Sequence, residues 1–241
     1  AGPDLESIIA GKGAGTEGLS RDEECTAVNL DIGGGTTNIA VFRNGQVIDT
    51  ACLDIGGRLI RLAKDNSAIE YIAPKVKRLA EKAGIVIREG ERLTLEKAEA
   101  ICMEMTKALE ELLGLRTKSE LLEMMLTGKD LKRNYTIDYV TFSGGVADFI
   151  YDSTDQNVFR FNDIGILLGK AISQSDIPRR LKMKRLNETI RATVVGAGAH
   201  TVEISGSTIT YTKNCFPLKN IPILKVHNGN EPEDMEKLDE R

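Results

Sequence analysis

The 241-residue sequence contains no tryptophan, two histidines and four cysteines, and it has no long uninterrupted hydrophobic run. With no CxxC pair and so few histidines, the residues for a dense zinc site are missing. The cysteines stand far apart, as expected for reduced thiols in a cytosolic protein, at Cys25, Cys52, Cys102 and Cys215. A run of roughly 18 apolar residues, which a membrane-spanning helix needs, is also lacking, so we expect no membrane partner.

An excess of positive charge is lacking as well. The 32 basic and 36 acidic residues give a net charge of −4, which argues against a nucleic-acid partner, since proteins that bind nucleic acids usually carry a basic face. Hydrophobic residues make up 41% of the chain and charged residues 28%. This composition excludes wholesale disorder and favours one sizeable core with room for an inserted subdomain.

The two ends of the chain show less apolar periodicity than its middle. Residues 1–25 are rich in glycine, and we expect a short helix over 5–10 followed by a flexible approach segment. Residues 228–241 are acidic and carry few apolar side chains, which predicts a disordered tail. The folded region is thus expected within residues 26–227.

Strand signals dominate the region that follows the approach segment. The stretches 26–31, 37–43 and 47–53 are apolar and β-branched. Asn44-Gly45, between the second and third stretches, is typical of a type I′ hairpin turn. The three stretches therefore predict an antiparallel meander.

The rest of the chain alternates strand and helix signals, as in an α/β protein. Further strands over 137–142 and 207–211 would complete a mixed five-stranded sheet, and residues 58–136 predict a mostly helical insertion before the fourth strand. The longest expected helix, 95–113, carries apolar residues at three- and four-residue steps. The other helices are expected over 57–64, 74–83, 119–126, 164–173 and 188–201.

The most informative segment is the glycine-rich stretch 31–38, between two predicted strands. Glycines let the backbone bring its N–H groups against a phosphate, and we expect Gly34 to need a positive φ. Asp31, at the strand end, is the candidate catalytic residue, because it can orient a hydrated Mg²⁺ or the attacking water. The candidate phosphate-binding residues are Gly33, Gly34, Gly35, Thr36, Thr37 and Asn38. A hairpin loop without a ligand is the alternative explanation.

Two later pairs of glycines indicate further contacts. Gly144 and Gly145 follow the predicted strand 137–142, and such a turn lets an adenosine approach the backbone, although an ordinary strand–helix turn would look the same. Gly196 and Gly198 interrupt a helical pattern. A segment beside the nucleotide, a hinge, or close packing of the helix against another element would each explain these small residues.

In order and spacing, these three segments resemble the second lobe of the actin/Hsp70/hexokinase nucleotide-binding superfamily. That lobe has a β-meander with a phosphate loop, a later Gly-Gly turn for adenosine and a helix of small residues. The flanking stretches 1–11, 29–39, 50–59 and 190–201 look like the ethanolamine ammonia-lyase reactivating factor family of the ethanolamine utilisation system, and 204–209 fits too. The resemblance covers nearly the whole chain and implies a ribonuclease-H-like α/β lobe of the actin/Hsp70 ATPase type.

The same resemblance implies a function. It points to a chaperone-like ATPase that acts on adenosylcobalamin-dependent ethanolamine ammonia-lyase and promotes the exchange of damaged cobalamin for intact cofactor. ATP and Mg²⁺ are the implied cofactors, with Asp31 holding Mg²⁺ through water, and cobalamin is reached only through the partner enzyme. We expect a cytoplasmic protein, free or associated with a bacterial microcompartment.

The resemblance further implies another phosphate loop in a first lobe, and nothing before Asp31 supplies one. We therefore expect residues 26–227 to form a second lobe and residues 1–25 to lead into it from a first. ATP hydrolysis is then expected of the full-length protein and little of these 241 residues alone. A sugar kinase, a filament-forming ATPase and a non-catalytic interaction module remain alternatives. The basic cluster 179–185 is either a solvated face or a contact for an acidic partner.

Overall fold

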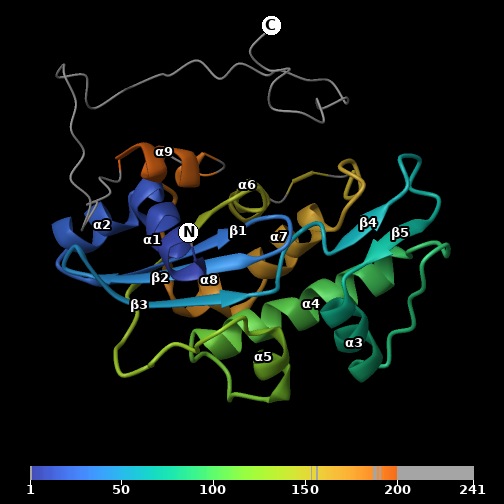
Figure 1. Ribbon diagram of the computed structural model, residues 1–241, viewed down its shortest axis with the longest axis horizontal. Helices are drawn as coiled ribbons and strands as arrows, with labels where there is room; N and C mark the ends of the chain where they lie inside the picture. The colour runs from blue at the N-terminus through green and yellow to red at the C-terminus, as the bar shows by residue number, and fades with distance from the viewer. Residues whose placement is uncertain (1, 153, 156, 187–188, 190, 200–241) are drawn as a thin grey trace, which may run out of the picture. The chain divides into compact units, whose positions relative to one another are not determined.

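A mixed five-stranded sheet of order β3-β2-β1-β6-β7 forms the centre of the fold (Figure 1). The computed structural model describes residues 2–199 apart from 153, 156, 187–188 and 190. The first three strands form the antiparallel meander, and β6 and β7 extend it in parallel from β1. The strands are β1 (Thr26–Ile32), β2 (Thr37–Arg43), β3 (Gln46–Leu53), β6 (Tyr139–Ser143) and β7 (Lys182–Met183). The predicted fold class, a ribonuclease-H-like α/β lobe with a mixed five-stranded sheet, is confirmed.

The hairpin between β2 and β3 has the predicted turn chemistry. Asn44 has φ 50° and Gly45 has φ 77°, so both central residues take the positive φ of a type I′ turn. The predicted fifth strand, 207–211, lies outside the described residues and stays a prediction. Among the described residues, the short strand β7 pairs with β6.

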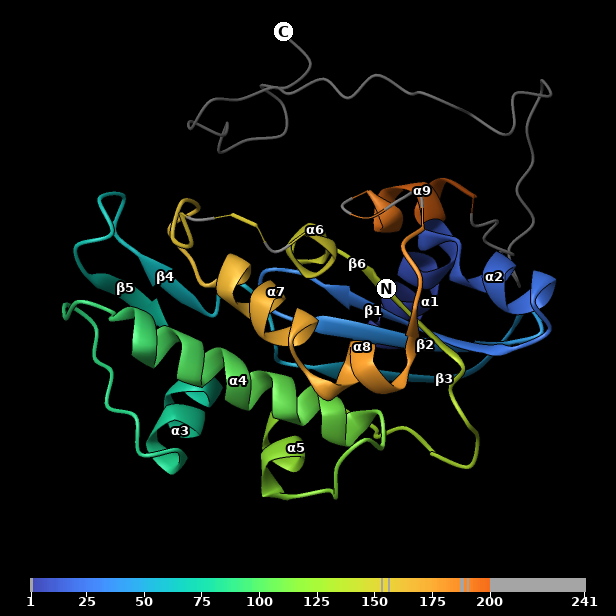
Figure 2. The same cartoon turned by 180° about the vertical axis from the view of Figure 1, so that it is seen from behind.

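The two faces of the sheet are covered by different helices (Figures 1 and 2). Val28, Leu30 and Ile32 of β1 belong to a core shared with α4 (Leu95–Leu112) and α7 (Gly165–Ser173). The alternate residues of β1, among them Asn29 and Asp31, face the side of α1 (Pro3–Ala14) and α2 (Thr16–Asp22), where Thr16 contacts Asn29. Helix α9 (Ala192–Ala199) packs on α1 on this second side.

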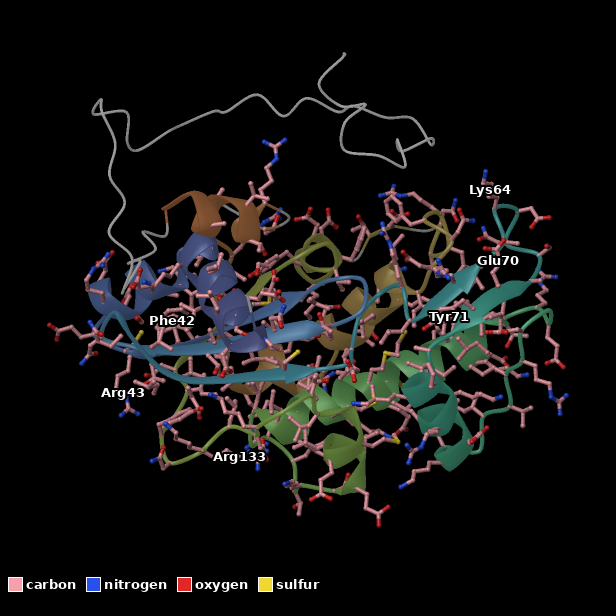
Figure 3. All side chains as sticks on the ribbon, in the orientation of Figure 1. Phe42, Arg43, Lys64, Glu70, Tyr71 and Arg133 are labelled. Carbon is pink, nitrogen blue, oxygen red and sulfur yellow. The ribbon has the colours of Figure 1, made fainter. Side chains whose placement is uncertain are left out.

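The amino-terminal region corrects the sequence analysis, which expected a flexible segment after residue 10. Residues 3–22 instead form α1 and α2, joined by Gly15 in the left-handed conformation at φ 91°. Gly11 lies so close to the ring of Phe42 on β2 that a Cβ would be 2.5 Å from the ring edge (Figure 3). The glycines that suggested a linker therefore allow α1 to approach the sheet closely.

The region between β3 and β6 holds three of the predicted helices and one hairpin. It holds α3 (Pro74–Lys82), α4 and α5 (Glu120–Met125), close to their expected bounds. The helix predicted over 57–64 is wrong, because β4 (Ile60–Leu62) pairs there with β5 (Ile69–Ile72). Burial alternates along β4, which is the period of a strand.

The remaining helices of the described part of the chain are α6 (Ala147–Tyr151) and α8 (Asp176–Arg180). Within the predicted helix 188–201, the structure has α9 over Ala192–Ala199, and residues 188, 190, 200 and 201 lie outside the described residues. None of the helices in the described residues is long and apolar enough to cross a membrane.

Candidate functional site

A cavity of about 360 Å³ lies where the loop after β1 faces the turn after β6. Of the predicted site residues, Gly33, Gly34 and Gly145 line it. The fold thus brings the predicted phosphate loop and the predicted adenosine turn to one cavity. The other lining residues are Gly57, Arg58, Val146, Asp148, Phe149, Phe161, Asp163 and Gly165.

The loop after β1 is shaped by its own backbone and by the segment that follows β3. The Gly33 N–H donates to the Thr36 carbonyl at 2.9 Å, and the Arg58 N–H donates to the Gly34 carbonyl at 2.6 Å. Gly34 does not have the expected positive φ. Close approach requires glycine at Gly56, where a Cβ would lie 2.5 Å from the Gly34 carbonyl oxygen, whereas a Cβ on Gly34 itself would lie 3.2 Å from the Arg58 Cδ. Gly35 has open space on its Cβ side.

Thr36, Thr37 and Asn38, at the end of this loop, make contacts within the fold. The Thr37 hydroxyl donates to the Ile55 carbonyl at 2.8 Å, and Asn38 is buried in β2 opposite Cys52. Thr36 supplies the carbonyl that closes the loop. Donation from these three residues to a phosphate stays a prediction.

The two glycines after β6 have different surroundings. Gly144 has φ 86°, and a Cβ there would lie 2.4 Å from the Ile32 carbonyl oxygen, so this residue holds the turn tightly against β1. Gly145 has no atom within 4 Å of a Cβ position and lines the cavity. Gly145 is therefore the residue of the pair that a ligand in the cavity would meet.

Asp31 is the penultimate residue of β1 and is not among the described residues that line the cavity. Its carboxylate accepts a hydrogen bond from the Ser143 hydroxyl at 2.7 Å and a longer one from the Thr193 hydroxyl at 3.4 Å. Burial raises the pKa of Asp31, and the two hydroxyl donors oppose that rise. Glu6, on α1, adds to it. Ser143 and Thr193 were not predicted, because only the parallel register of β1 and β6 and the docking of α9 bring them to Asp31.

Behind Ser143, a chain of buried polar side chains crosses from β6 to β1. The Asn29 amide donates to the Ser143 hydroxyl at 3.0 Å, and the Asn29 carbonyl oxygen accepts from the Thr141 hydroxyl at 3.0 Å. Thr141 lies 2.8 Å from the hydroxyl of Thr16 on α2. These bonds orient the Ser143 hydroxyl as a donor to Asp31, which fixes the position of the carboxylate.

A second carboxylate, Asp163, lies in the cavity wall beside Arg58. The Arg58 Nε is 3.7 Å from one Asp163 oxygen, and the Gly165 N–H donates to the other at 2.9 Å. Burial raises the pKa of Asp163, while the backbone donor and Arg58 lower it. Sequence reasoning missed both residues. Arg58 fell within a helix that does not form, and Asp163 precedes α7 without any motif around it.

Gly196 and Gly198 lie in α9, and Gly196 is not among the described residues that line the cavity. Gly196 packs against α1, where a Cβ would lie 1.9 Å from the Ile9 carbonyl oxygen and 3.0 Å from the Gly13 nitrogen. Close packing, one of the three explanations considered for these glycines, accounts for Gly196. A role of either residue beside a nucleotide stays a prediction.

Comparison with known proteins gives one family and two close relatives. Residues 1–241 match the model of the family described as ethanolamine utilisation protein EutA. The chain is 36% identical over 223 residues to ethanolamine ammonia-lyase reactivase EutA of Salmonella typhimurium and 35% identical over 223 residues to that of Escherichia coli. Each match covers 92% of this chain and 47% of the relative, so the chain spans about half the length of these relatives.

Solved structures with similar folds are more distant. One is MreB 5 of Spiroplasma citri bound to AMPPNP, with 15% sequence identity and a TM-score of 0.38. The match covers 80% of this chain and 57% of MreB 5.

Proposed function

Because this chain belongs to the EutA family of ethanolamine utilisation proteins, we propose that it forms a nucleotide-binding lobe of an ATP-dependent reactivating factor for ethanolamine ammonia-lyase. The factor would promote the exchange of damaged cobalamin for intact adenosylcobalamin in that enzyme. The observation that carries the nucleotide site is the single cavity formed by Gly33 and Gly34 on one side and Gly145 on the other.

The residues around the cavity fit a nucleotide with Mg²⁺. Gly33, Gly34 and Gly145 present backbone without side chains, which suits the close approach of phosphate and ribose groups. Arg58 supplies positive charge at the phosphate end. Asp31 is a desolvated carboxylate whose hydrogen-bond donors are hydroxyl groups, and no ion pair links it to a cation in the described part of the chain. A hydrated Mg²⁺ would provide the missing positive charge.

The chain's own groups have distinct tasks in this proposal. Asp31, held by Ser143 and Thr193, would orient water at the phosphate loop. The loop N–H groups would stabilise charge on the phosphates. ATP, when bound, supplies the free energy that shifts the protein between two lobe arrangements, because it binds one arrangement more tightly than the other.

The partner enzyme defines the rest of the proposal. Ethanolamine ammonia-lyase is the protein partner, and cobalamin is contacted through it. A cytoplasmic location belongs to the same proposal, because a reactivating factor has to meet its enzyme. Association with a bacterial microcompartment is a further part of it.

The test uses the intact natural protein and ethanolamine ammonia-lyase that has been loaded with cyanocobalamin, which cannot support turnover. We expect added adenosylcobalamin and Mg-ATP to restore deamination only when the protein is present. The Asp31→Ala variant is expected to fold and to lose both ATP hydrolysis and reactivation. Equal recovery without nucleotide would contradict an ATP-dependent mechanism.

A further inference from the structure

Arg58 is the single cation among the described residues that line the cavity, whereas Asp148 and Asp163 contribute two carboxylates. A nucleoside triphosphate brings several more negative charges into the same space. Without a positive group, these charges would repel one another in a region of low dielectric constant. Among the described lining residues, Arg58 is therefore the side chain that can offset part of the charge of a polyphosphate.

The backbone of Arg58 is attached to the phosphate loop. Its N–H donates to the Gly34 carbonyl at 2.6 Å. Its aliphatic stem covers Gly34, since a Cβ on that glycine would lie 3.2 Å from the Arg58 Cδ. The guanidinium group is thus held next to the loop, although the side chain remains 74% exposed.

The contact of Arg58 with Asp163 is loose. The Nε–oxygen distance of 3.7 Å is longer than a hydrogen bond, and an ion pair with an exposed partner contributes little to stability. Asp163 is held without it, because its other oxygen accepts the Gly165 N–H at 2.9 Å and its side chain is only 11% exposed. Arg58 can therefore leave Asp163 without disturbing the cavity wall.

We propose that Arg58 is a phosphate-binding residue whose guanidinium group exchanges Asp163 for the polyphosphate of a nucleoside di- or triphosphate. This inference rests on the proposed function, in which this cavity binds the nucleotide. The planar guanidinium group presents a fork of N–H donors that matches phosphate oxygens. The Asp163 carboxylate competes with phosphate for the N–H donors of Arg58. Its charge keeps the guanidinium group at the cavity until a phosphate replaces it.

This arrangement predicts opposite effects for the two partners of the pair. Removal of the guanidinium group weakens nucleotide binding, and removal of the competing charge on Asp163 strengthens it. In a purely structural ion pair, the two substitutions would act in the same direction. The sign of the Asp163 effect therefore separates a phosphate ligand from a structural contact.

The experiment measures the affinity of the intact natural protein for Mg-ATP, Mg-ADP and AMP by calorimetric titration. Arg58→Gln keeps most of the stem over Gly34, and Arg58→Ala removes it. We expect both to weaken Mg-ATP and Mg-ADP binding about 10- to 100-fold, the range of a lost charge-assisted contact, and to change AMP binding much less. Asp163→Asn is expected to tighten Mg-ATP binding about two- to fivefold.

Arg61→Ala is the matched control. Arg61 is close in sequence, but its guanidinium carbon lies 4.8 Å from the ring centre of Tyr71, and it is not among the described residues that line the cavity. Tyr71, in the β4–β5 hairpin, is labelled in Figure 3. Its substitution should leave all three affinities unchanged. Circular dichroism and thermal unfolding check that each variant is folded.

The outcomes separate the two proposals. Wild-type protein that fails to bind Mg-ATP overturns the proposed function and this inference with it. Wild-type binding that both Arg58 variants retain overturns only the role of Arg58. Weaker binding in Asp163→Asn as well as in Arg58→Gln shows a structural pair and also overturns it.

Discussion

At the scale of single residues, Asp31 is a buried carboxylate whose negative charge is only partly stabilised by the surrounding protein. Two hydroxyl groups donate to it, and burial still raises its pKa above the ordinary value of 3.8. An ionised carboxylate in this position lowers the stability of the folded protein at neutral pH. A buried carboxylate with a raised pKa is common at functional sites, which agrees with the proposed role of Asp31 at the phosphate loop.

We predict that Asp31→Asn stabilises the fold at neutral pH and lowers ATP hydrolysis by the intact protein at least about 100-fold. The folded protein takes up a proton on Asp31 at higher pH than the unfolded chain does. Wild type therefore gains stability relative to the variant as pH falls from the raised pKa toward 3.8. Thermal unfolding over this pH range measures the effect.

The control for this prediction is Asp65→Asn. Asp65 is exposed, and hydrogen bonds from Ser67 lower its pKa, so its substitution should not raise the melting temperature. An Asp31→Asn variant that is less stable than wild type at pH 7 would show that burial does not dominate at Asp31.

Gly144 and Gly145 offer a direct comparison between a structural and a ligand-facing glycine. Gly144→Ala combines φ 86° with a Cβ only 2.4 Å from the Ile32 carbonyl oxygen, and we expect a loss of at least about 2 kcal/mol of unfolding free energy. Gly145→Ala meets open space and should change stability by less than about 0.5 kcal/mol while it weakens nucleotide binding. Urea unfolding and titration with Mg-ATP separate the two effects, and equal losses of stability would contradict this assignment.

At the scale of secondary-structure elements, the contact between α1 and α9 controls one side of the Asp31 site. A Cβ on Gly13 of α1 would lie 1.6 Å from the Ala192 carbonyl oxygen, so the two helices touch at the backbone. Thr193, next to Ala192 on α9, donates to Asp31. Any change that separates the helices therefore also moves a hydrogen-bond donor away from the carboxylate.

We predict that Gly13→Ala lowers the unfolding free energy by about 2–4 kcal/mol, because one methyl group cannot fit between the helices. Gly18→Ala in α2 is the matched control. The nearest atom to its Cβ, the Arg21 Nη2, is at an ordinary 3.6 Å, and alanine favours a helix over glycine. That variant should be more stable by about 0.5–1 kcal/mol. Opposite signs in denaturant titrations confirm the prediction, whereas a neutral Gly13→Ala contradicts it.

At the scale of the whole molecule, the described residues fall within one compact unit, residues 1–201. The chain spans 47% of the length of its two close relatives. In the proposed function, a second lobe outside these 241 residues would hold the nucleotide from the other side. The lobe formed by this chain would then supply only part of the hydrogen bonds around the phosphates.

We predict that the 241-residue chain folds alone but binds Mg-ATP weakly and hydrolyses almost none. Each missing charge-assisted hydrogen bond is worth roughly 1.5–3 kcal/mol, so the loss of several weakens binding by orders of magnitude. Calorimetric titration and a phosphate-release assay, run beside the full-length Escherichia coli relative, test this expectation. Micromolar affinity with steady phosphate release would show that this lobe suffices.

Several parts of the structure follow from local sequence patterns. The meander was predictable because runs of apolar and β-branched residues and the Asn44-Gly45 turn act over a few positions. Helix α4 was predictable because its apolar stripe repeats over several turns. The glycine-rich loop could be identified as a candidate phosphate site for the same reason, since its residues are contiguous.

The contacts around Asp31 and the cavity could be seen only in the tertiary structure, because they join residues that are distant in the sequence. Ser143 reaches Asp31 because β6 pairs in parallel with β1, and Arg58 reaches the cavity because the segment after β3 folds back on the phosphate loop. The glycines of α1 looked like a linker, although Gly11 and Gly13 allow close contacts with the sheet and α9. The helices, strands and glycine-rich motifs could be predicted because each depends on residues that are close together in the sequence. The contacts of Ser143, Arg58, Gly11 and Gly13 depend instead on strand register and on how the helices pack, which no single segment of the sequence determines.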